Sequence, residues 1–285
     1  MEKYMIDTHV HIWDLEKARY QWLEGDTSML NRSYGPEELL PEAAGTPVAS
    51  GILVQAANHT RDTELMLEAA HNHTFISGVV GWLPLTDPEQ TAKLLETRFL
   101  RNGYFKGVRH LIHNEADPAW LLQDAVLESL RILALHNIPY DVVGVNDLHL
   151  QTAITVAEKI PDLRLVLDHL NQPPVKNGRQ FGAWGALIKA IAANGNVYAK
   201  ISGLGTASGN PEGWRAEDIA PCVEYALQTF GADRCMLGGD WPVCRLAGSY
   251  AQHWEAYTGI VSGLLNREDA GKVFYGNAAR FYNVQ

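Results

Sequence analysis

Short apolar runs alternate with amphipathic stretches along the whole of this 285-residue chain, and this alternation restricts its fold more than any other feature. Continuous Val, Ile and Leu runs are typical of parallel strands covered on both faces, and amphipathic stretches are typical of the covering helices. We count eight strands: Tyr4–Trp13, Ser50–Ala57, Phe75–Leu83, Gly107–Ile112, Tyr140–Val145, Leu163–His169, Val197–Ser202 and Arg234–Gly239. This series predicts an α/β fold, a (β/α)₈ TIM barrel, as a single domain over residues 1–285. An open, doubly wound sheet is the alternative, because the strand count alone does not exclude it.

Several predicted helices carry recognisable signals at their ends. Asp87-Pro88 and Asp117-Pro118 each combine an N-cap residue with proline at the first helical position. Gly231 directly follows a helical stretch and is typical of a residue that ends a helix. The segment Asp14–Pro36 is long for a connection between a strand and a helix, so we expect it to cover an active site.

Charge and cysteine content indicate which partners and compartment to expect. The chain has 23 Lys and Arg against 33 Asp and Glu, a net charge of −10, which repels nucleic-acid phosphates and anionic membrane surfaces. A neutral small molecule is the expected partner, and assembly into a homo-oligomer stays open. No apolar run approaches the length of a membrane-spanning helix, and the start of the chain lacks the apolar core of a signal peptide. The cysteines, Cys222, Cys235 and Cys244, are odd in number and form no C-x-x-C pair, so we expect a cytoplasmic protein.

Polar side chains stand at the ends of three predicted strands, where a barrel carries its catalytic groups. The first strand contains His9 and His11, which side-chain alternation places on one side together with Asp7. The sixth strand ends with His169, and Asp240 follows the eighth. A lone histidine pair is usually a hydrogen-bonded surface feature, and an Asp after two glycines is often a turn residue. Their joint occurrence at strand ends favours a shared catalytic site.

This order of residues, His-x-His on the first strand, His on the sixth and Asp after the eighth, resembles the amidohydrolase superfamily. Within that superfamily, several blocks are similar to those of the L-fuconolactonases and related sugar lactonases, and together they cover nearly the whole chain. The blocks are Leu53–Ala57, Gly78–Trp82, Gly107–His110, Lys200–Leu204, Gly239–Val243 and Asn277–Tyr282. The resemblance implies a hydrolase that opens a sugar lactone, such as an L-fucono-, L-rhamnono- or related aldonolactone, to the aldonic acid.

The resemblance also bears on metal binding and on the substrate. Binuclear metalloenzymes of the superfamily carry a bridging Lys or Glu at the end of strand four and a His at the end of strand five, whereas these ends read Val108-Arg109-His110 and Tyr140-Asp141-Val142 here. The related lactonases work without a divalent ion, so the resemblance implies that no cofactor is needed. If a divalent ion such as zinc were bound, His9, His11 and Asp240 would be its ligands. Gln172 stands where the group often has Lys, and this departure leaves the particular sugar open.

The four catalytic candidates have distinct expected roles. Asp240 is the expected general base, because a carboxylate beside a water can deprotonate it during attack on the lactone carbonyl and return the proton to the ring oxygen. His9, His11 and His169 would polarise the carbonyl oxygen as it gains negative charge. Two alternatives stay open: a zinc-dependent decarboxylase or amidohydrolase of the same superfamily, and, in another class, a catalytically inactive sugar-binding barrel.

Six further side chains are expected to contact the substrate: Trp13, Gln55, Arg109, His110, Asp141 and Trp241. The arginine and the histidine of strand four would bind hydroxyl groups or the developing carboxylate, with a structural ion pair outside the barrel as the alternative for the arginine. The glutamine and the aspartate occupy strand positions where apolar residues are usual, so they predict substrate hydrogen bonds or buried structural networks. The two tryptophans would form an apolar wall under the sugar, or else part of the core.

Overall fold

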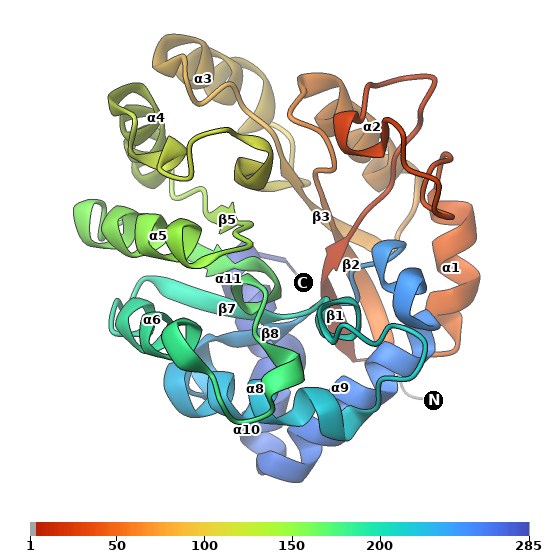
Figure 1. The fold of residues 1–285 in the computed structure, drawn as a ribbon. Helices are drawn as coiled ribbons and strands as arrows, with labels where there is room; N and C mark the ends of the chain where they lie inside the picture. Colours follow the sequence, from red (N-terminus) through yellow and green to blue (C-terminus); the bar gives the residue numbers. More distant parts are fainter. Residues whose placement is uncertain (1–3, 285) are drawn as a thin grey trace.

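Eight parallel strands form a barrel in the computed structural model, which describes residues 4–284 (Figure 1). The strands are Met5–Val10 (β1), Val48–Val54 (β2), Ile76–Gly81 (β3), Phe105–His110 (β4), Tyr140–Val142 (β5), Leu165–Leu167 (β6), Val197–Ile201 (β7) and Cys235–Leu237 (β8), and each pairs with its neighbours in the sequence. Backbone hydrogen bonds close the ring: the amide of Asp240 donates to the carbonyl of His9, and that of His11 to the carbonyl of Trp241, both at 2.7 Å. This sequential, closed order excludes the doubly wound sheet, whose strand order would reverse.

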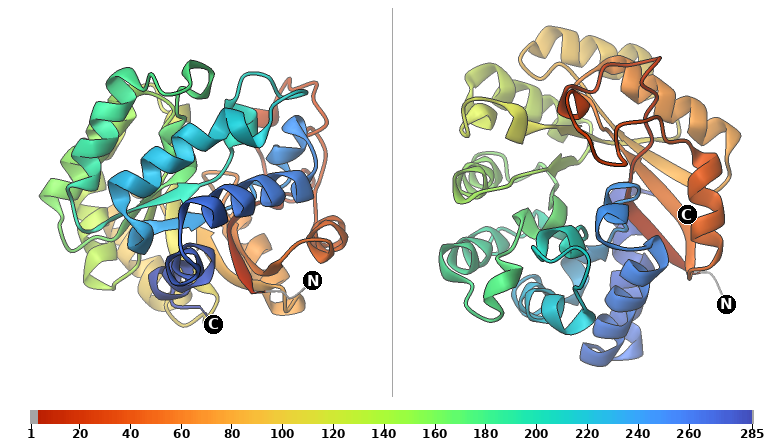
Figure 2. Two further views of the ribbon diagram at one scale, coloured as in Figure 1. Left: turned by 90° about the horizontal axis from the view of Figure 1, so that it is seen from below. Right: turned by 45° about the vertical axis from the view of Figure 1, so that its right-hand side comes forward.

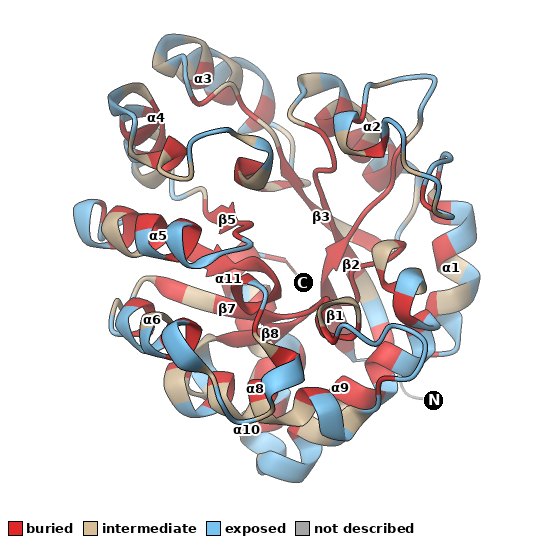
Figure 3. Cartoon of the chain, viewed as in Figure 1, coloured by how far each residue is buried: buried red, intermediate tan, exposed pale blue. Residues whose placement is uncertain are grey.

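Helices connect successive strands and form an outer layer, with their inner faces buried and their outer faces exposed (Figure 3). They are Pro36–Ala44 (α1), Thr60–Asn72 (α2), Pro88–Leu94 (α3), Asp124–Leu135 (α4), Asp147–Lys159 (α5), Gly182–Ala192 (α6), Leu204–Ala207 (α7), Ala216–Phe230 (α8), Tyr250–Leu264 (α9), Arg267–Gly271 (α10) and Asn277–Tyr282 (α11). All eight predicted strands are confirmed, with boundaries that differ by up to three residues. Residues 1–3 and 285 of the predicted domain lie outside the described residues. Within residues 4–284, no helix is both long and apolar enough to cross a membrane.

Two of the three predicted helix signals are confirmed. The carboxylate of Asp87 accepts the amide hydrogen of Gln90 at the start of α3. Gly231 ends α8 with a φ of +76°, a conformation that suits glycine. The third prediction is wrong, because Asp117 caps only a tight turn and α4 begins at Asp124. Between them lies a short 3₁₀ helix, Trp120–Leu122, whose Trp120 and Leu121 side chains are buried.

The half of the barrel interior nearest the amino-terminal ends of the strands is apolar. Its side chains pack against those of the C-terminal helix α11, and the cluster includes Ile6, Ile52, Val54, Val80, Val166, Met236, Phe281 and Tyr282. The ammonium of Lys106, near the start of β4, donates to the carbonyl of Asn283 at 2.8 Å. Helix α11 therefore closes the amino-terminal end of the barrel, which leaves the carboxyl end for a site (Figure 2).

The segment between β1 and α1 runs beside α2 at the carboxyl end of the barrel (Figure 2). Trp22 anchors it by donating its indole N–H to the carbonyl of Ala56 at 2.8 Å. The hydroxyl of Tyr20 donates to the buried carboxylate of Asp62 on α2 at 2.9 Å. Because Trp22 also lines the cavity described next, the predicted covering role of this segment agrees with its position.

Candidate active site

A cavity of about 220 Å³ opens at the carboxyl end of the barrel. Its apolar wall consists of Trp22, Ala56, Leu111, Val143, Val145 and Val243, and its polar lining consists of His11, Arg109, His113, His169, Gln172, Thr206 and Asp240. A concave, largely apolar site with a few converging polar groups is typical of small-molecule binding. Three of the four predicted catalytic residues therefore line one cavity, and the fourth, His9, lies against His11 behind it.

His9, near the end of β1, and His11, the residue after the strand, lie inside the barrel, whereas Asp7 points outward. The carboxylate of Asp7 accepts the hydroxyl hydrogen of Tyr250, on α9 in the outer layer, at 2.6 Å. The prediction that Asp7 shares a side with His9 and His11 is therefore wrong. The register of β1 against β2 shifts between Asp7 and Val10, and such a bulge interrupts side-chain alternation.

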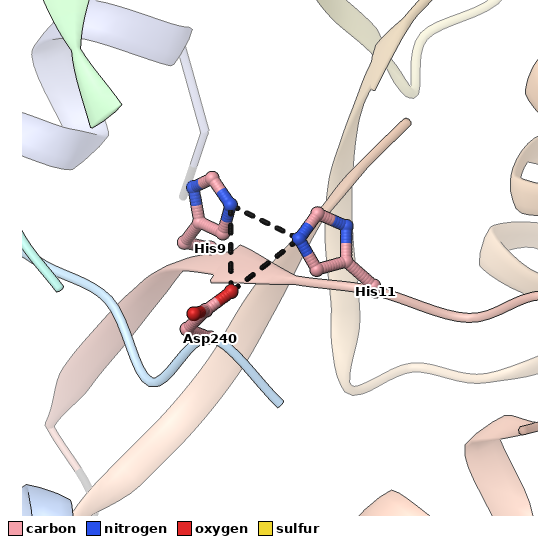
Figure 4. Close-up of side chains that lie close together, drawn as sticks. All are labelled: His9, His11 and Asp240. Atoms are coloured by element: carbon pink, nitrogen blue, oxygen red, sulfur yellow. Dashed lines mark hydrogen bonds and ion pairs between the residues drawn. The ribbon is translucent and has the colours of Figure 1, made fainter. Parts of the chain in front are cut away.

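Two imidazoles and one carboxylate converge beside the cavity (Figure 4). His9 Nε2 lies 3.1 Å from His11 Nε2, and Asp240 Oδ1 lies 3.8 Å from the former and 3.5 Å from the latter. His11 Nδ1 is 2.7 Å from the carbonyl oxygen of Val54, which can only accept, so Nδ1 carries the hydrogen of the neutral ring. Arg109 Nη1, which can only donate, lies 3.3 Å from His9 Nε2. Both Nε2 atoms therefore present lone pairs where they meet Asp240.

This donor set fits a divalent cation. Three lone pairs directed at one point repel each other unless a positive charge lies between them, and two imidazoles with a carboxylate are ligands that zinc accepts. The three ligand atoms lie within 4.8 Å of one another. His9, His11 and Asp240 therefore form a site that could hold an ion such as zinc.

Asp240 is held as a charged group by its surroundings. Its backbone is left-handed, with a φ of +55°, a conformation that Asp and Asn adopt more readily than most residues. Gly239 before it cannot carry a side chain, since a Cβ atom there would lie 2.4 Å from the ring of Tyr250. Burial raises the pKa of the Asp240 carboxyl, but the neighbouring rings of His169, His11 and His9 lower it by more, so the pKa lies below its ordinary value. The group is a carboxylate at neutral pH.

His169 begins a run of four left-handed residues that ends at Gln172, with φ angles from +50° to +55°. This backbone costs about 1–2 kcal/mol per residue outside glycine, so neighbouring contacts must hold it. Ser202 Oγ accepts the amide hydrogen of His169 and lies 2.9 Å from its Nδ1. The serine hydroxyl can thus donate to Nδ1, which leaves the hydrogen of the neutral ring on Nε2, 3.9 Å from Asp240 Oδ1.

Arg109 links the cavity to a carboxylate inside the barrel. Its Nη1 lies 2.9 Å from Asp168 Oδ2, and its Nη2 donates to the carbonyl of Gln55. Asp168 Oδ1 faces His9 Nδ1 at 3.3 Å. Burial raises the pKa of Asp168, but Lys200, His9 and Arg109 lower it by more, so it lies well below its ordinary value. The ion pair of Arg109 is therefore inside the barrel, next to the predicted catalytic group.

Three predicted substrate contacts do not reach the cavity. His110 follows Arg109 on β4 and points the other way, stacked on Trp120 with ring centroids 3.9 Å apart. Gln55 is fully buried and donates to the carbonyl of Arg109 at 3.1 Å. Asp141 lies in the barrel interior, 2.5 Å from the ammonium of Lys200. The positions of Gln55 and Asp141 correspond to the alternative of buried structural networks rather than to substrate binding.

The two predicted tryptophans belong to the core. Trp241 is fully buried and donates its indole N–H to Glu42 at 3.0 Å. Trp13 is also buried, and its ring meets that of Trp22 edge to face with centroids 5.2 Å apart. Trp22, which sequence reasoning did not single out, is the tryptophan that forms a wall of the cavity.

Sequence reasoning also missed the interior charges Asp168 and Lys200. The available signal was their position within otherwise apolar strand sequence, Val166-Leu167-Asp168 and Tyr198-Ala199-Lys200-Ile201. A charged residue there must have a buried partner, since an unpaired charge inside a barrel is costly. The partners are Arg109 on β4, Asp141 on β5 and His9 on β1, and no local pattern reveals them.

The closed barrel, with a His-x-His pair at the end of the first strand and an aspartate after the eighth, defines a (β/α)₈ barrel with a small-molecule site at its carboxyl end. The amidohydrolase family model matches residues 6–284, so the chain belongs to the amidohydrolase family. The resemblance stated from the sequence is thereby confirmed.

Three known proteins show how similar the chain is to relatives. L-fucono-1,5-lactonase of Burkholderia ambifaria is 32% identical over 99% of this chain and 96% of its own. L-fucono-1,5-lactonase of Burkholderia multivorans is 31% identical over 97% of this chain and 95% of its own. The crystal structure of an amidohydrolase from Burkholderia multivorans with bound zinc superposes with a TM-score of 0.88, at 30% identity over 99% of both chains.

Proposed function

We propose that this protein is a lactonase that opens a sugar lactone, an L-fucono-, L-rhamnono- or related aldonolactone, to the aldonic acid. The observation that carries the proposal is the convergence of the Asp240 carboxylate with the imidazoles of His11 and His169 at one small cavity and of His9 directly behind it. Two relatives that match nearly the full chain are named L-fucono-1,5-lactonase, which supports the same reaction class here. The cavity volume and its mixed lining suit a single sugar ring.

Asp240 acts as the general base in this proposal. Its carboxylate removes a proton from a water that attacks the lactone carbonyl, and the C–O bond to the ring oxygen then breaks. The same proton passes from Asp240 to the departing ring oxygen, so the residue returns to its starting state. The neighbouring imidazoles keep this carboxyl group ionised although it is buried.

The histidines have unequal roles in the reaction. His169 presents Nε2–H toward the cavity side of Asp240, so it can donate to the carbonyl oxygen as negative charge develops. Arg109 adds a fixed positive charge beside His9 Nε2. His9 and His11 present lone pairs when neutral, and burial lowers the pKa of both rings, so they polarise the carbonyl only through a proton or a cation that they share with Asp240.

A divalent ion held by His9, His11 and Asp240 would polarise the carbonyl and lower the pKa of a bound water. We propose that turnover does not depend on such an ion. The support is the guanidinium of Arg109, which lies 3.3 Å from His9 Nε2 and already supplies positive charge beside the three lone pairs. Metal analysis of the purified protein, with activity measured before and after chelation, tests this part of the proposal.

A screen of sugar lactones by acid release in a pH-indicator assay tests the reaction class. Hydrolysis of aldonolactones above the spontaneous rate is the expected result. Metal-dependent release of CO₂ from a carboxylic acid, without lactone hydrolysis, would favour the decarboxylase alternative. Saturable sugar binding without any turnover would favour an inactive binding barrel.

The three cysteines suit an enzyme of the cytoplasm, where we place it. Cys222, Cys235 and Cys244 are all buried and free, as is usual in a reducing compartment. The net charge of −10 suits a neutral lactone better than an anionic macromolecule.

A further inference from the structure

Lys200 is a fully buried lysine near the carboxyl end of β7, and the proposed reaction does not use it. It lies inside the barrel beneath the cavity and takes no part in the cavity lining. Its Nζ is 2.5 Å from Asp141 Oδ2, 3.1 Å from Asp168 Oδ1 and 3.4 Å from His9 Nδ1. One ammonium therefore contacts two carboxylates and the far side of a catalytic imidazole.

A purely structural role does not explain why the chain buries a charged lysine here at a cost in free energy. A buried ion pair is often no more stabilising than apolar side chains of similar size, because desolvation offsets the attraction. The neighbouring interior positions are occupied by apolar side chains, such as those of Val166 and Met236. Lys200 lies at the boundary between this apolar interior and the active site. Its position there indicates a contribution to the site rather than to packing.

The contacts of Asp168 show what this contribution is. Besides Lys200, the carboxylate contacts Arg109 Nη1 at 2.9 Å and His9 Nδ1 at 3.3 Å. Both groups turn their other ends toward the reacting region, where His9 Nε2 meets Arg109 and His11. A carboxylate behind a ring nitrogen fixes the tautomer and orientation of that ring. Asp168 can do so only while its own position is fixed.

We infer that Lys200 is a positioning residue of the active site, which holds Asp168 in the orientation that orders Arg109 and His9. The inference rests on the proposed lactonase function for its kinetic consequence, but not for its structural one. Because Arg109 can only donate, Nε2 of His9 is the acceptor and the hydrogen of the neutral ring lies on Nδ1, which is 3.3 Å from Asp168 Oδ1. If Lys200 instead donated to Nδ1, the hydrogen of the neutral His9 ring would lie on Nε2. Nε2–H and an N–H of Arg109 would then face each other as two donors without an acceptor, with Nε2 and Nη1 3.3 Å apart.

A charge-balanced double variant separates positioning from simple charge neutralisation. Lys200→Met alone leaves Asp141 with a buried, unpaired charge, so the variant is expected to lose stability whatever the role of Lys200. Lys200→Met/Asp141→Asn removes one charge of each sign, and Asn can still accept the hydroxyl hydrogen of Tyr282. The controls are Asp141→Asn alone and Lys106→Met, which replaces a strand lysine whose ammonium donates to the backbone carbonyl of Asn283.

The double variant is expected to regain most of the denaturation midpoint lost in Lys200→Met. Its kcat on the best sugar lactone should stay roughly 10- to 100-fold below that of the wild type, the usual effect of losing a supporting contact, with KM nearly unchanged. Recovery of wild-type kcat together with stability would overturn the inference, because Lys200 would then be only a counter-ion. Failure of the double variant to fold would overturn it as well, by assigning Lys200 to the fold.

Nitrogen NMR of the histidine rings gives a readout that does not need turnover. The ring signals of His9, assigned by their loss in His9→Gln, should show Nδ1–H in the wild type and should change in the double variant. The ring signals of His136, the residue that follows α4, should be the same in the wild type and in the double variant. Unchanged His9 signals would contradict the positioning role, whereas a wild type inactive on every lactone would contradict only the proposed function.

Discussion

Replacement of Asp240 by asparagine tests the central step of the proposed reaction. Asparagine has nearly the same shape as aspartate, tolerates the left-handed backbone at this position, and can still accept a hydrogen bond. An amide cannot remove a proton from water at neutral pH. The variant therefore removes the base while leaving the packing of the site in place.

The geometry of the site sets the expected size of the effect. Asp240 Oδ1 lies 3.5, 3.8 and 3.9 Å from the Nε2 atoms of His11, His9 and His169, so the substitution breaks no close hydrogen bond. A positioned general base accelerates a reaction by roughly 10²- to 10⁴-fold, which corresponds to about 3 to 5 kcal/mol of activation free energy. We expect kcat to fall by this factor. KM should change by less than about threefold, because Arg109 and His169 remain to bind the substrate.

The assay is acid release from a sugar lactone in weak buffer, with the spontaneous rate subtracted. Urea denaturation of the variant establishes that it is folded, and Asp162→Asn, at an exposed position, provides a matched control. A folded Asp240→Asn enzyme that keeps most of its turnover would refute the assignment of the base. The role would then pass to a histidine, with His169 the first to test.

Three further predictions address the metal, the backbone and pH. Turnover should survive exhaustive chelation, and loss of activity that zinc or manganese restores would show that the reaction depends on an ion at the site of Figure 4. Gly203→Ala should lower kcat by up to roughly 10²-fold, because the new Cβ would lie 2.7 Å from His169 Nδ1 on a backbone with a φ of +64°. Gly259→Ala, in open space on α9, is the control and should keep its kcat. Equal kcat values for the two variants would contradict this prediction. Burial raises the pKa of Asp62 to about 6, so its contribution to stability is present below the unfolded value near 4 and is lost as pH rises through about 6. Urea unfolding should therefore show that Asp62→Asn is more destabilising at pH 4.5 than at pH 7.5, by about 2 kcal/mol, and an equal effect at both pH values would contradict the raised pKa.

The strand pattern was sufficient to predict the fold and the general place of the site. Apolar runs report burial on both faces, and a parallel strand with a helix after it is a local unit, so eight such units could be counted from the sequence. His11, His169 and Asp240 could be placed because the carboxyl ends of all strands in a barrel meet at one end. These inferences need only local periodicity and chain order.

Side-chain direction was predictable only where the backbone is regular. Strict alternation would put Asp7 beside His9, but the shifted register of β1 turns it toward α9. Asp168 and His169 are adjacent and should point in opposite directions, yet both serve the site because a left-handed turn begins at His169. A bulge and a left-handed turn leave no reliable trace in the composition of a short segment.

The sequence by itself determined the architecture, the family and the residues at the strand ends, because these depend on periodicity and on the order of motifs along the chain. Only the tertiary structure decided that Trp22, not Trp13, forms the cavity wall, and that Lys200 and Asp168 meet His9 inside the barrel. Lys200 and His9 are 191 residues apart in the sequence, and barrel closure brings β7 and β1 around the same interior. Partners of buried charges are chosen by such long-range closure, so their identity appears only when the ring is complete.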